Sequence, residues 1–107
     1  MQISQYDIVL VNLDTTVGSE IQKTRPCVVI SPDEINHNLS TIVIAPMTST
    51  SRNYPTRVKV KHNNKDGFVV IDQIRTIDKR RIIKKFDTLH SAEIKILKEV
   101  IKETFVD

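Results

Sequence analysis

The chain has 107 residues and a mass of 12.3 kDa, so we expect a single domain over residues 1–107. Its net charge of +3 and isoelectric point near 9.1 allow a polyanionic partner without requiring one. Apolar runs of about six residues are far shorter than the roughly 20 that cross a bilayer, and residues 1–5 lack a secretory-signal pattern. We therefore expect a cytoplasmic protein without membrane contact. The single cysteine, Cys27, excludes an internal disulfide and a cysteine-ligated metal cluster, so we expect a buried thiol. We also expect neither a metal nor another cofactor.

Short β-branched runs flanked by turn residues predict five or six strands. In chain order these are Asp7–Leu13, Pro26–Ser31, Thr41–Met47, Arg57–Lys61, Gly67–Asp72 and, as the sixth, Arg81–Phe86. The segment from Thr41 to Ala45 is apolar throughout and should be a central strand, whereas Arg57–Lys61 alternates and should have one solvated face. Asp66 and Gly67 predict a hairpin turn between the fourth strand and the fifth.

Two helices are expected. Ser31 as N-cap, Pro32 at the first helical position and Glu34 three residues after the cap predict a short helix that ends near Asn38. The segment from Ser91 to Phe105 is the clearest helix, with Glu93 in its first turn. The apolar residues on one face of this helix, which should pack on the sheet, are Ile94, Leu97, Ile101 and Phe105. Together these elements predict a mainly β fold: a small, curled antiparallel barrel or half-barrel with a C-terminal helix.

The connection between the first two strands is the most informative segment for function. It runs from Asp14 to Thr24, although two such strands could be joined by only a few residues. It contains Gly18, one of 2 glycines in the chain, and places Glu20 five residues before Arg25. A loop of this length usually serves function, and a carboxylate near a guanidinium is typical of phosphate chemistry.

Two runs of cations are candidates for surfaces that face phosphate groups. One comprises Lys79, Arg80, Arg81, Lys84 and Lys85, and the other comprises Arg52, Arg57, Lys59, Lys61 and Lys65. The alternative is that both are solvated strand faces that protect sheet edges from aggregation. The sequence leaves both interpretations open.

Taken in order, these motifs resemble the MazF/PemK/Kid toxins of bacterial toxin–antitoxin pairs. The resemblance spans nearly the whole chain and rests on the motifs Gly18-Ser19-Glu20, Arg25-Pro26, Pro46-Met47-Thr48-Ser49 and Asp72-Gln73-Ile74-Arg75-Thr76-Ile77-Asp78. It implies an SH3-like barrel that forms a homodimer and cleaves single-stranded mRNA at short sequences without a metal. The expected products carry a 2′,3′-cyclic phosphate, or a related 3′-phosphate, and a 5′-hydroxyl. An acidic, MazE-like antitoxin is the expected protein partner.

The residues of the chain can support this chemistry. Arg25 offers a rigid fork of donors for two phosphate oxygens, and Thr48 offers a neutral hydroxyl donor. Glu20, which matches a functionally important Glu in the family, is the candidate general base. The candidate RNA-binding residues are Ser19, Lys23, Thr50, Asp72, Gln73 and Arg75. The three histidines, His37, His62 and His90, fall in polar segments or helix ends, and we expect them to be solvated surface residues.

The chain departs from the Kid-type members, which have a His directly after the loop Gly and an Arg two positions before the Asp. Here Ser19 and Val70 occupy these positions, and the chain resembles the MazF branch instead. Two other functions remain possible on the same fold. One is a non-enzymatic gyrase inhibitor similar to CcdB, which binds a protein through its terminal helix, and the other is an SH3-like module that only binds nucleic acid.

Overall fold

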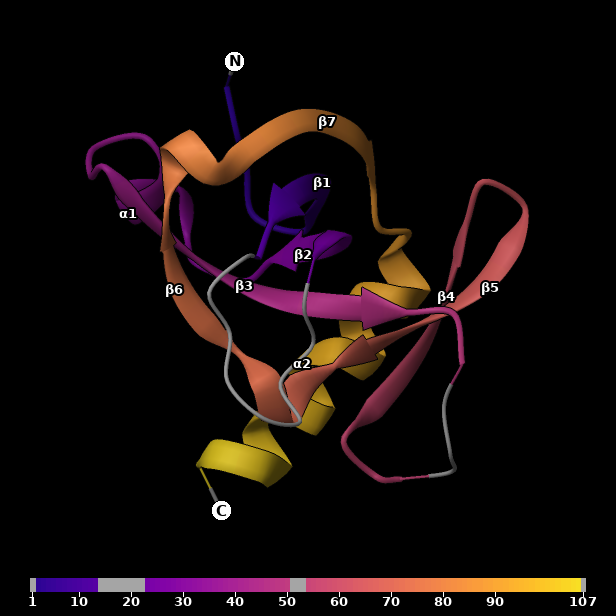
Figure 1. The fold of residues 1–107 in the computed structure, drawn as a ribbon. Coiled ribbons are helices and arrows are strands. Elements are labelled where there is room, and N and C mark those ends of the chain that lie inside the picture. The colour runs from indigo at the N-terminus through magenta and orange to yellow at the C-terminus, as the bar shows by residue number, and fades with distance from the viewer. Residues whose placement is uncertain (1, 14–22, 51–53, 107) are drawn as a thin grey trace.

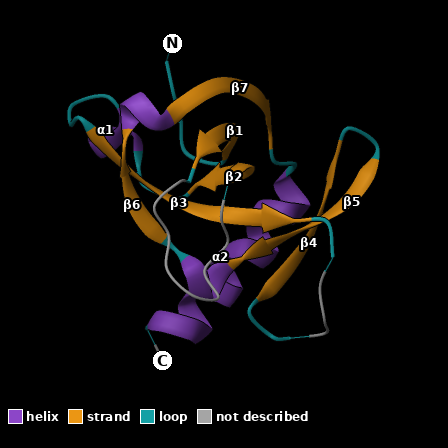
Figure 2. Cartoon of the chain, in the orientation of Figure 1, coloured by secondary structure: helices purple, strands orange, loops and turns teal. Residues whose placement is uncertain are grey.

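One curled antiparallel sheet forms the body of the protein (Figure 1, Figure 2). The structure, a computed structural model, describes residues 2–13, 23–50 and 54–106. The strands are β1 (Asp7–Asn12), β2 (Thr24–Val29), β3 (Thr41–Thr48), β4 (Arg57–His62), β5 (Lys65–Val70), β6 (Arg75–Asp78) and β7 (Ile82–Thr88). The helices are α1 (Asp33–Asn36) and α2 (Ser91–Phe105), with single 3₁₀ turns η1 (Ile71–Gln73) and η2 (Lys79–Arg81). This confirms the predicted fold class, a mainly β half-barrel with a short helix after β2 and a terminal helix.

Strand β3 is the centre of the sheet, as its apolar sequence predicted. The strand order is β4-β5-β3-β2-β1-β7, and β6 also pairs with β3. Residues Thr41 to Ile44 of β3 pair with β6, whereas Met47 and Thr48 pair with β5. Pro46, which has no N–H to donate, lies between these two stretches, where β3 changes partners. The sheet therefore bends at the end of β3 that carries Thr48.

The hairpin between β4 and β5 turns at a different place from the one predicted. The turn residues are Asn63 and Asn64, whose φ angles of 54° and 61° are those of a type I′ turn. Asp66 and Gly67, which were expected to form the turn, lie inside β5 and pair with Lys61 and Val60 of β4. Asparagine is one of the few residues that enter the left-handed region easily, so the Asn-Asn pair determines the turn.

Two further differences concern the ends of predicted elements. Asp72 was expected to end a strand but lies in η1, and β6 follows as a short strand that the sequence did not predict. Helix α1 ends at Asn36 rather than near Asn38, and Ser31 does not cap it. Instead, the Ser31 hydroxyl donates a hydrogen bond to Asn36 Oδ1 (2.5 Å) and accepts one from the Val43 N–H (3.0 Å).

Helix α2 packs on the sheet through a single fully buried leucine. Leu97 has no exposed surface, and Ile94 and Ile101 are half-buried against the same cluster of core side chains. Phe105 was predicted on this face, but it is 58% exposed because it lies at the end of the helix. The Glu93 carboxylate accepts hydrogen bonds from the N–H groups of His90 (2.9 Å) and Lys61 (2.8 Å). The first turn of α2 is thereby fixed to β4.

Within the described ranges, no helix has the length and apolar character needed to span a membrane.

Replacing the buried leucine of α2 tests how far the fold depends on this helix. We expect Leu97→Ala to lower the free energy of unfolding by about 2–5 kcal/mol, because it leaves a cavity under the helix. The matched control is Ile96→Ala in the same helix turn, where a side chain 50% exposed should change stability by only about 0.5 kcal/mol. Urea denaturation measures both, and equal losses would show that α2 does not anchor the core.

Candidate active site

The pairing of β2 with β3 determines where Arg25 and Thr48 lie. Cys27 is opposite Pro46 in this antiparallel register, and two residues further along each strand are Arg25 and Thr48. Both residues line one pocket of about 250 Å³. Two residues that lie 23 positions apart in the sequence (48 − 25) are therefore brought to the same cavity.

Arg25 is half-buried, and its Nε atom is buried without a hydrogen-bond partner among the described residues. Leaving a buried donor unsatisfied costs about 1–3 kcal/mol, so such atoms in native proteins require an explanation. An anionic oxygen in the pocket would supply the missing acceptor. A guanidinium also has a fork of donors that matches two phosphate oxygens.

Thr48 ends β3 in a local turn. Its hydroxyl donates a hydrogen bond to the Thr50 carbonyl (3.1 Å) and lies 3.4 Å from the Thr50 N–H, from which it accepts. The hydroxyl proton must therefore rotate away from the Thr50 carbonyl before it can reach a ligand. Thr50, a predicted RNA-binding residue, contacts the Thr48 hydroxyl through its backbone carbonyl and N–H groups.

The β4–β5 hairpin supplies five further lining residues of the pocket. No sequence motif connects this hairpin with the site. The hairpin residues that line the pocket are His62, Asn63, Lys65, Asp66 and Gly67. β5 reaches this position because Phe68 pairs with Thr48 and Val69 with Met47. A Cβ at Gly67 would lie 3.2 Å from the Met47 methyl carbon, so the absence of a side chain permits this close packing.

His62 is not the solvated surface residue that we expected. Its ring packs edge-on against Phe86, with 4.8 Å between ring centroids and an interplanar angle of 65°. Its Nδ1 atom is buried and has no hydrogen-bond partner among the described residues. The alternation in β4 indicates this position, because Val58, Val60 and His62 share one face and both valines are buried. The alternation of residues along β4 therefore indicates that His62 lies on the buried face, although its polar neighbours in the sequence suggest a solvated position.

The other predicted site residues lie outside the described lining of this pocket or outside the described part of the chain. Ser19 and Glu20 fall outside the described residues. Lys23 is exposed just before β2, with a φ of 68°. Asp72 accepts a hydrogen bond from Arg57 Nη1 (2.8 Å), and Gln73 follows it in η1. None of Lys23, Thr50, Asp72, Gln73 and Arg75 belongs to the described lining of the pocket.

Cys27 is fully buried beside the site, which confirms the predicted buried thiol. Burial raises the pKa of the Cys27 thiol to about 12, and the positive charge of Arg75 opposes this rise. The guanidinium of Arg75 therefore lies within electrostatic reach of the β2 residue that is two positions from Arg25. The thiol itself remains protonated at neutral pH and is not a nucleophile.

Several cations of the two basic runs are paired with acids. The ion pairs are Arg57–Asp72, Lys59–Asp66, Lys61–Asp66, Arg80–Asp78 and Lys85–Asp7. Hydrogen bonds from Arg80 hold the pKa of the Asp78 carboxyl below its ordinary value. These pairs reduce the positive charge that either surface can present to a phosphate.

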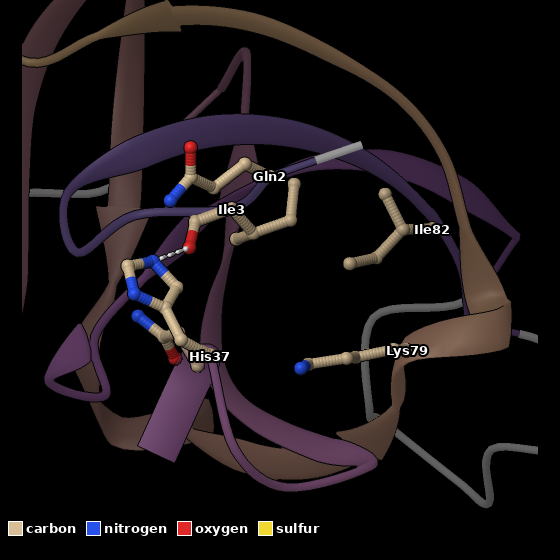
Figure 3. A pocket seen from close by; sticks show the side chains of 6 residues that line it. Gln2, Ile3, His37, Lys79 and Ile82 are labelled. Atoms are coloured by element: carbon tan, nitrogen blue, oxygen red, sulfur yellow. Dashed lines mark hydrogen bonds between the residues drawn. The ribbon is translucent and has the colours of Figure 1, made fainter. Parts of the chain in front are cut away.

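A second pocket, of about 340 Å³, lies near α1 and is lined by residues that include Ile3, His37 and Lys79 (Figure 3). Its His37 is already partnered, because Nε2 is 3.0 Å from the Ile3 carbonyl oxygen. In the described ranges, the two buried side-chain atoms without a partner are Arg25 Nε and His62 Nδ1, and both residues line the first pocket. We therefore assign the candidate site to the first pocket.

Comparison with known proteins agrees with this fold. The family model described as the PemK-like, MazF-like toxin of type II toxin–antitoxin systems matches residues 4–105. The endoribonuclease toxin MazF of Escherichia coli K12 is 33% identical over 96 residues, which cover 89% of this chain and 86% of that protein. The chain therefore belongs to the PemK/MazF-like toxin family.

Two solved structures have the same fold. MazF from Deinococcus radiodurans superimposes with a TM-score of 0.88 at 21% identity, covering 100% of this chain and 99% of that one. The MazE–MazF complex from the same organism gives a TM-score of 0.82 at 22% identity, covering 99% and 97%. At these identities the likeness establishes the fold alone.

Proposed function

We propose that this chain is an endoribonuclease toxin that cleaves single-stranded mRNA at specific short sequences without a metal ion. The observation that carries the proposal is the buried, unpartnered Nε of Arg25 in the same pocket as Thr48. The proposal is supported by the family of the chain and by the related E. coli protein, which is named an endoribonuclease toxin. The gyrase-inhibitor alternative does not explain an arginine donor held unsatisfied inside a pocket.

In the proposed reaction, the 2′-hydroxyl of one nucleotide attacks the adjacent phosphodiester. The products are a 2′,3′-cyclic phosphate and a 5′-hydroxyl. Arg25 stabilises the charge that develops on the phosphate oxygens, and the Thr48 hydroxyl adds a second donor. Glu20 is proposed as the general base that takes the 2′ proton. The proposed RNA-binding residues are Ser19, Lys23, Thr50, Asp72, Gln73 and Arg75.

The direct test is to incubate the purified protein with a long single-stranded RNA in the presence of EDTA and to map the new ends. Cuts at a recurring short sequence that leave 5′-hydroxyl ends support the proposal. An absence of cleavage, or cleavage that EDTA abolishes, contradicts it.

We expect Arg25→Ala and Thr48→Ala each to slow cleavage at least about a hundredfold, equivalent to roughly 3 kcal/mol of transition-state stabilisation. Single-turnover cleavage of the mapped RNA site measures the loss, and thermal denaturation checks that each variant folds. Arg80→Ala is the charge-matched control, because this guanidinium is 91% exposed and bonded to Asp78. If the control loses as much activity as Arg25→Ala, overall charge rather than the pocket controls the rate.

Glu20→Gln tests the proposed base. A carboxylate base must be ionised to act, so the wild-type rate should rise from acid to neutral pH. We expect the variant to be slower and this rise to flatten. A variant whose pH profile on the acid side matches the wild type would show that another group takes the 2′ proton.

We also propose that the protein acts in the cytoplasm as a homodimer and that an acidic, MazE-like antitoxin neutralises it. The net charge of +3 suits an acidic partner, and the similar Deinococcus MazF was solved with MazE. Sedimentation equilibrium at micromolar concentration should give twice the chain mass of 12.3 kDa. A mass of one chain under conditions where RNA is cleaved would exclude the dimer as the active form.

A further inference from the structure

We propose that His62 is a further catalytic residue: the general acid that protonates the 5′-oxygen of the departing nucleotide. This inference rests on the proposed endoribonuclease function, and it assigns the one proton transfer that Arg25, Thr48 and Glu20 leave without a suitable donor.

The first observation is that two buried nitrogens without hydrogen-bond partners belong to residues that line the same pocket. Arg25 Nε and His62 Nδ1 are the two buried side-chain atoms without partners in the described part of the chain, and both residues line the 250 Å³ pocket. They come from elements distant in sequence, β2 and the end of β4. A phosphodiester bound in this pocket would therefore lie beside both residues.

The second observation is how the imidazole is held. His62 is the last residue of β4 and pairs with Lys65 across the turn at Asn63 and Asn64. The edge-on contact with Phe86 restricts the ring, and the bond from the Lys61 N–H to Glu93 fixes the adjacent backbone. A general acid must be positioned before the reaction, and this ring is supported by β7 as well as by its own hairpin.

The third observation is access to solvent protons. His62 and Asn63 also line a third pocket, of about 570 Å³, whose other lining residues include Asp87 and His90. His62 thus lines both the candidate site and a cavity large enough to hold water. A group that gives up a proton in each turnover can be reprotonated from this second side.

The charged groups that face His62 come from every element around it. Arg25, Lys65 and Asp66 line the first pocket. Lys61, Asp87 and His90 line the third pocket, of about 570 Å³. The Asp66 carboxylate is shared between Lys59 and Lys61, so its charge is partly neutralised. Both signs of charge therefore occur among the residues that line the two pockets beside His62.

The chemistry of the step balances. The bond from the 2′-oxygen to phosphorus forms as the bond from phosphorus to the 5′-oxygen breaks. The proposed base takes the 2′ proton, and the imidazolium of His62 gives its proton to the 5′-oxygen. Arginine is a poor donor for this purpose because a guanidinium keeps its proton far above neutral pH, whereas an imidazole changes its charge between about pH 5 and 8.

The test compares pH–rate profiles for cleavage of one mapped RNA site by wild type, His62→Gln and His37→Gln. Because a general acid must be protonated, the wild-type rate should fall on the alkaline side of its optimum. We expect His62→Gln to be at least about a hundredfold slower at its best pH and to lose this alkaline fall. His37→Gln replaces a histidine in the 340 Å³ pocket near α1, and this variant should keep the wild-type rate and pH profile.

A structural role for His62 would give a different result. A variant that is slower but keeps the wild-type alkaline fall would overturn the proposal, and so would one with an unchanged rate. The second variant is His62→Ala, in which we expect added imidazole to restore part of the lost rate. Failure of imidazole to restore any activity in a folded His62→Ala protein also counts against the proposal.

One measurement does not depend on a variant folding. Imidazole NMR signals of the wild-type protein can be followed while a single-stranded oligonucleotide with a 2′-deoxy substitution at the cleavage site is added. We expect the His62 signal to shift and the His37 signal to remain, and an unmoved His62 signal at saturation would overturn the proposal. If wild type does not cleave RNA at all, the proposed function fails, whereas normal cleavage by His62→Gln refutes only the role of His62.

Discussion

The antiparallel register of β2 against β3 is the constraint on which the site depends. Side chains alternate along a strand, so a slip of one residue would turn Arg25 away from the pocket and move Cys27 from one apolar cluster toward the other. The register is fixed by burial rather than by the polar residues themselves. Cys27, Val29 and Ile44 pack in one apolar cluster, and Val28 and Ala45 pack in a second cluster on the opposite face. An odd slip would exchange these two sets of side chains and disrupt the packing of both clusters. The packing of the apolar core therefore determines the position of the Arg25 guanidinium.

The β4–β5 hairpin converts the end of β2 and β3 into a pocket. Its position follows from three contacts of different kinds: the pairing of β5 with the last residues of β3, the close packing permitted by Gly67, and the bond between Lys61 and Glu93. The last contact connects the hairpin to α2, which is itself held by Leu97. The stability of the helix and the geometry of the pocket are thus coupled, although no residue of α2 belongs to the described lining of that pocket.

The sequence predicted the fold well because most of its strands are β-branched and flanked by turn residues. It failed where the deciding contacts are not local. β6 is four residues long and exists as a strand because Ile77 packs in the core opposite Ile42. Arg25 and Thr48 were identified through their motifs, but that they share a pocket follows only from strand pairing. His62 was misjudged because its polar neighbours in sequence concealed its position on the buried face of β4.

The proposed cleavage of RNA gives a reason for an imidazole and a guanidinium that line one pocket. A guanidinium keeps its proton at neutral pH, and this makes it a constant source of positive charge for the phosphate but a poor proton donor. The two tasks, stabilising charge and moving a proton, therefore favour two different side chains in one pocket. Arg25 and His62 have these complementary properties, and each has one buried nitrogen without a hydrogen-bond partner among the described residues.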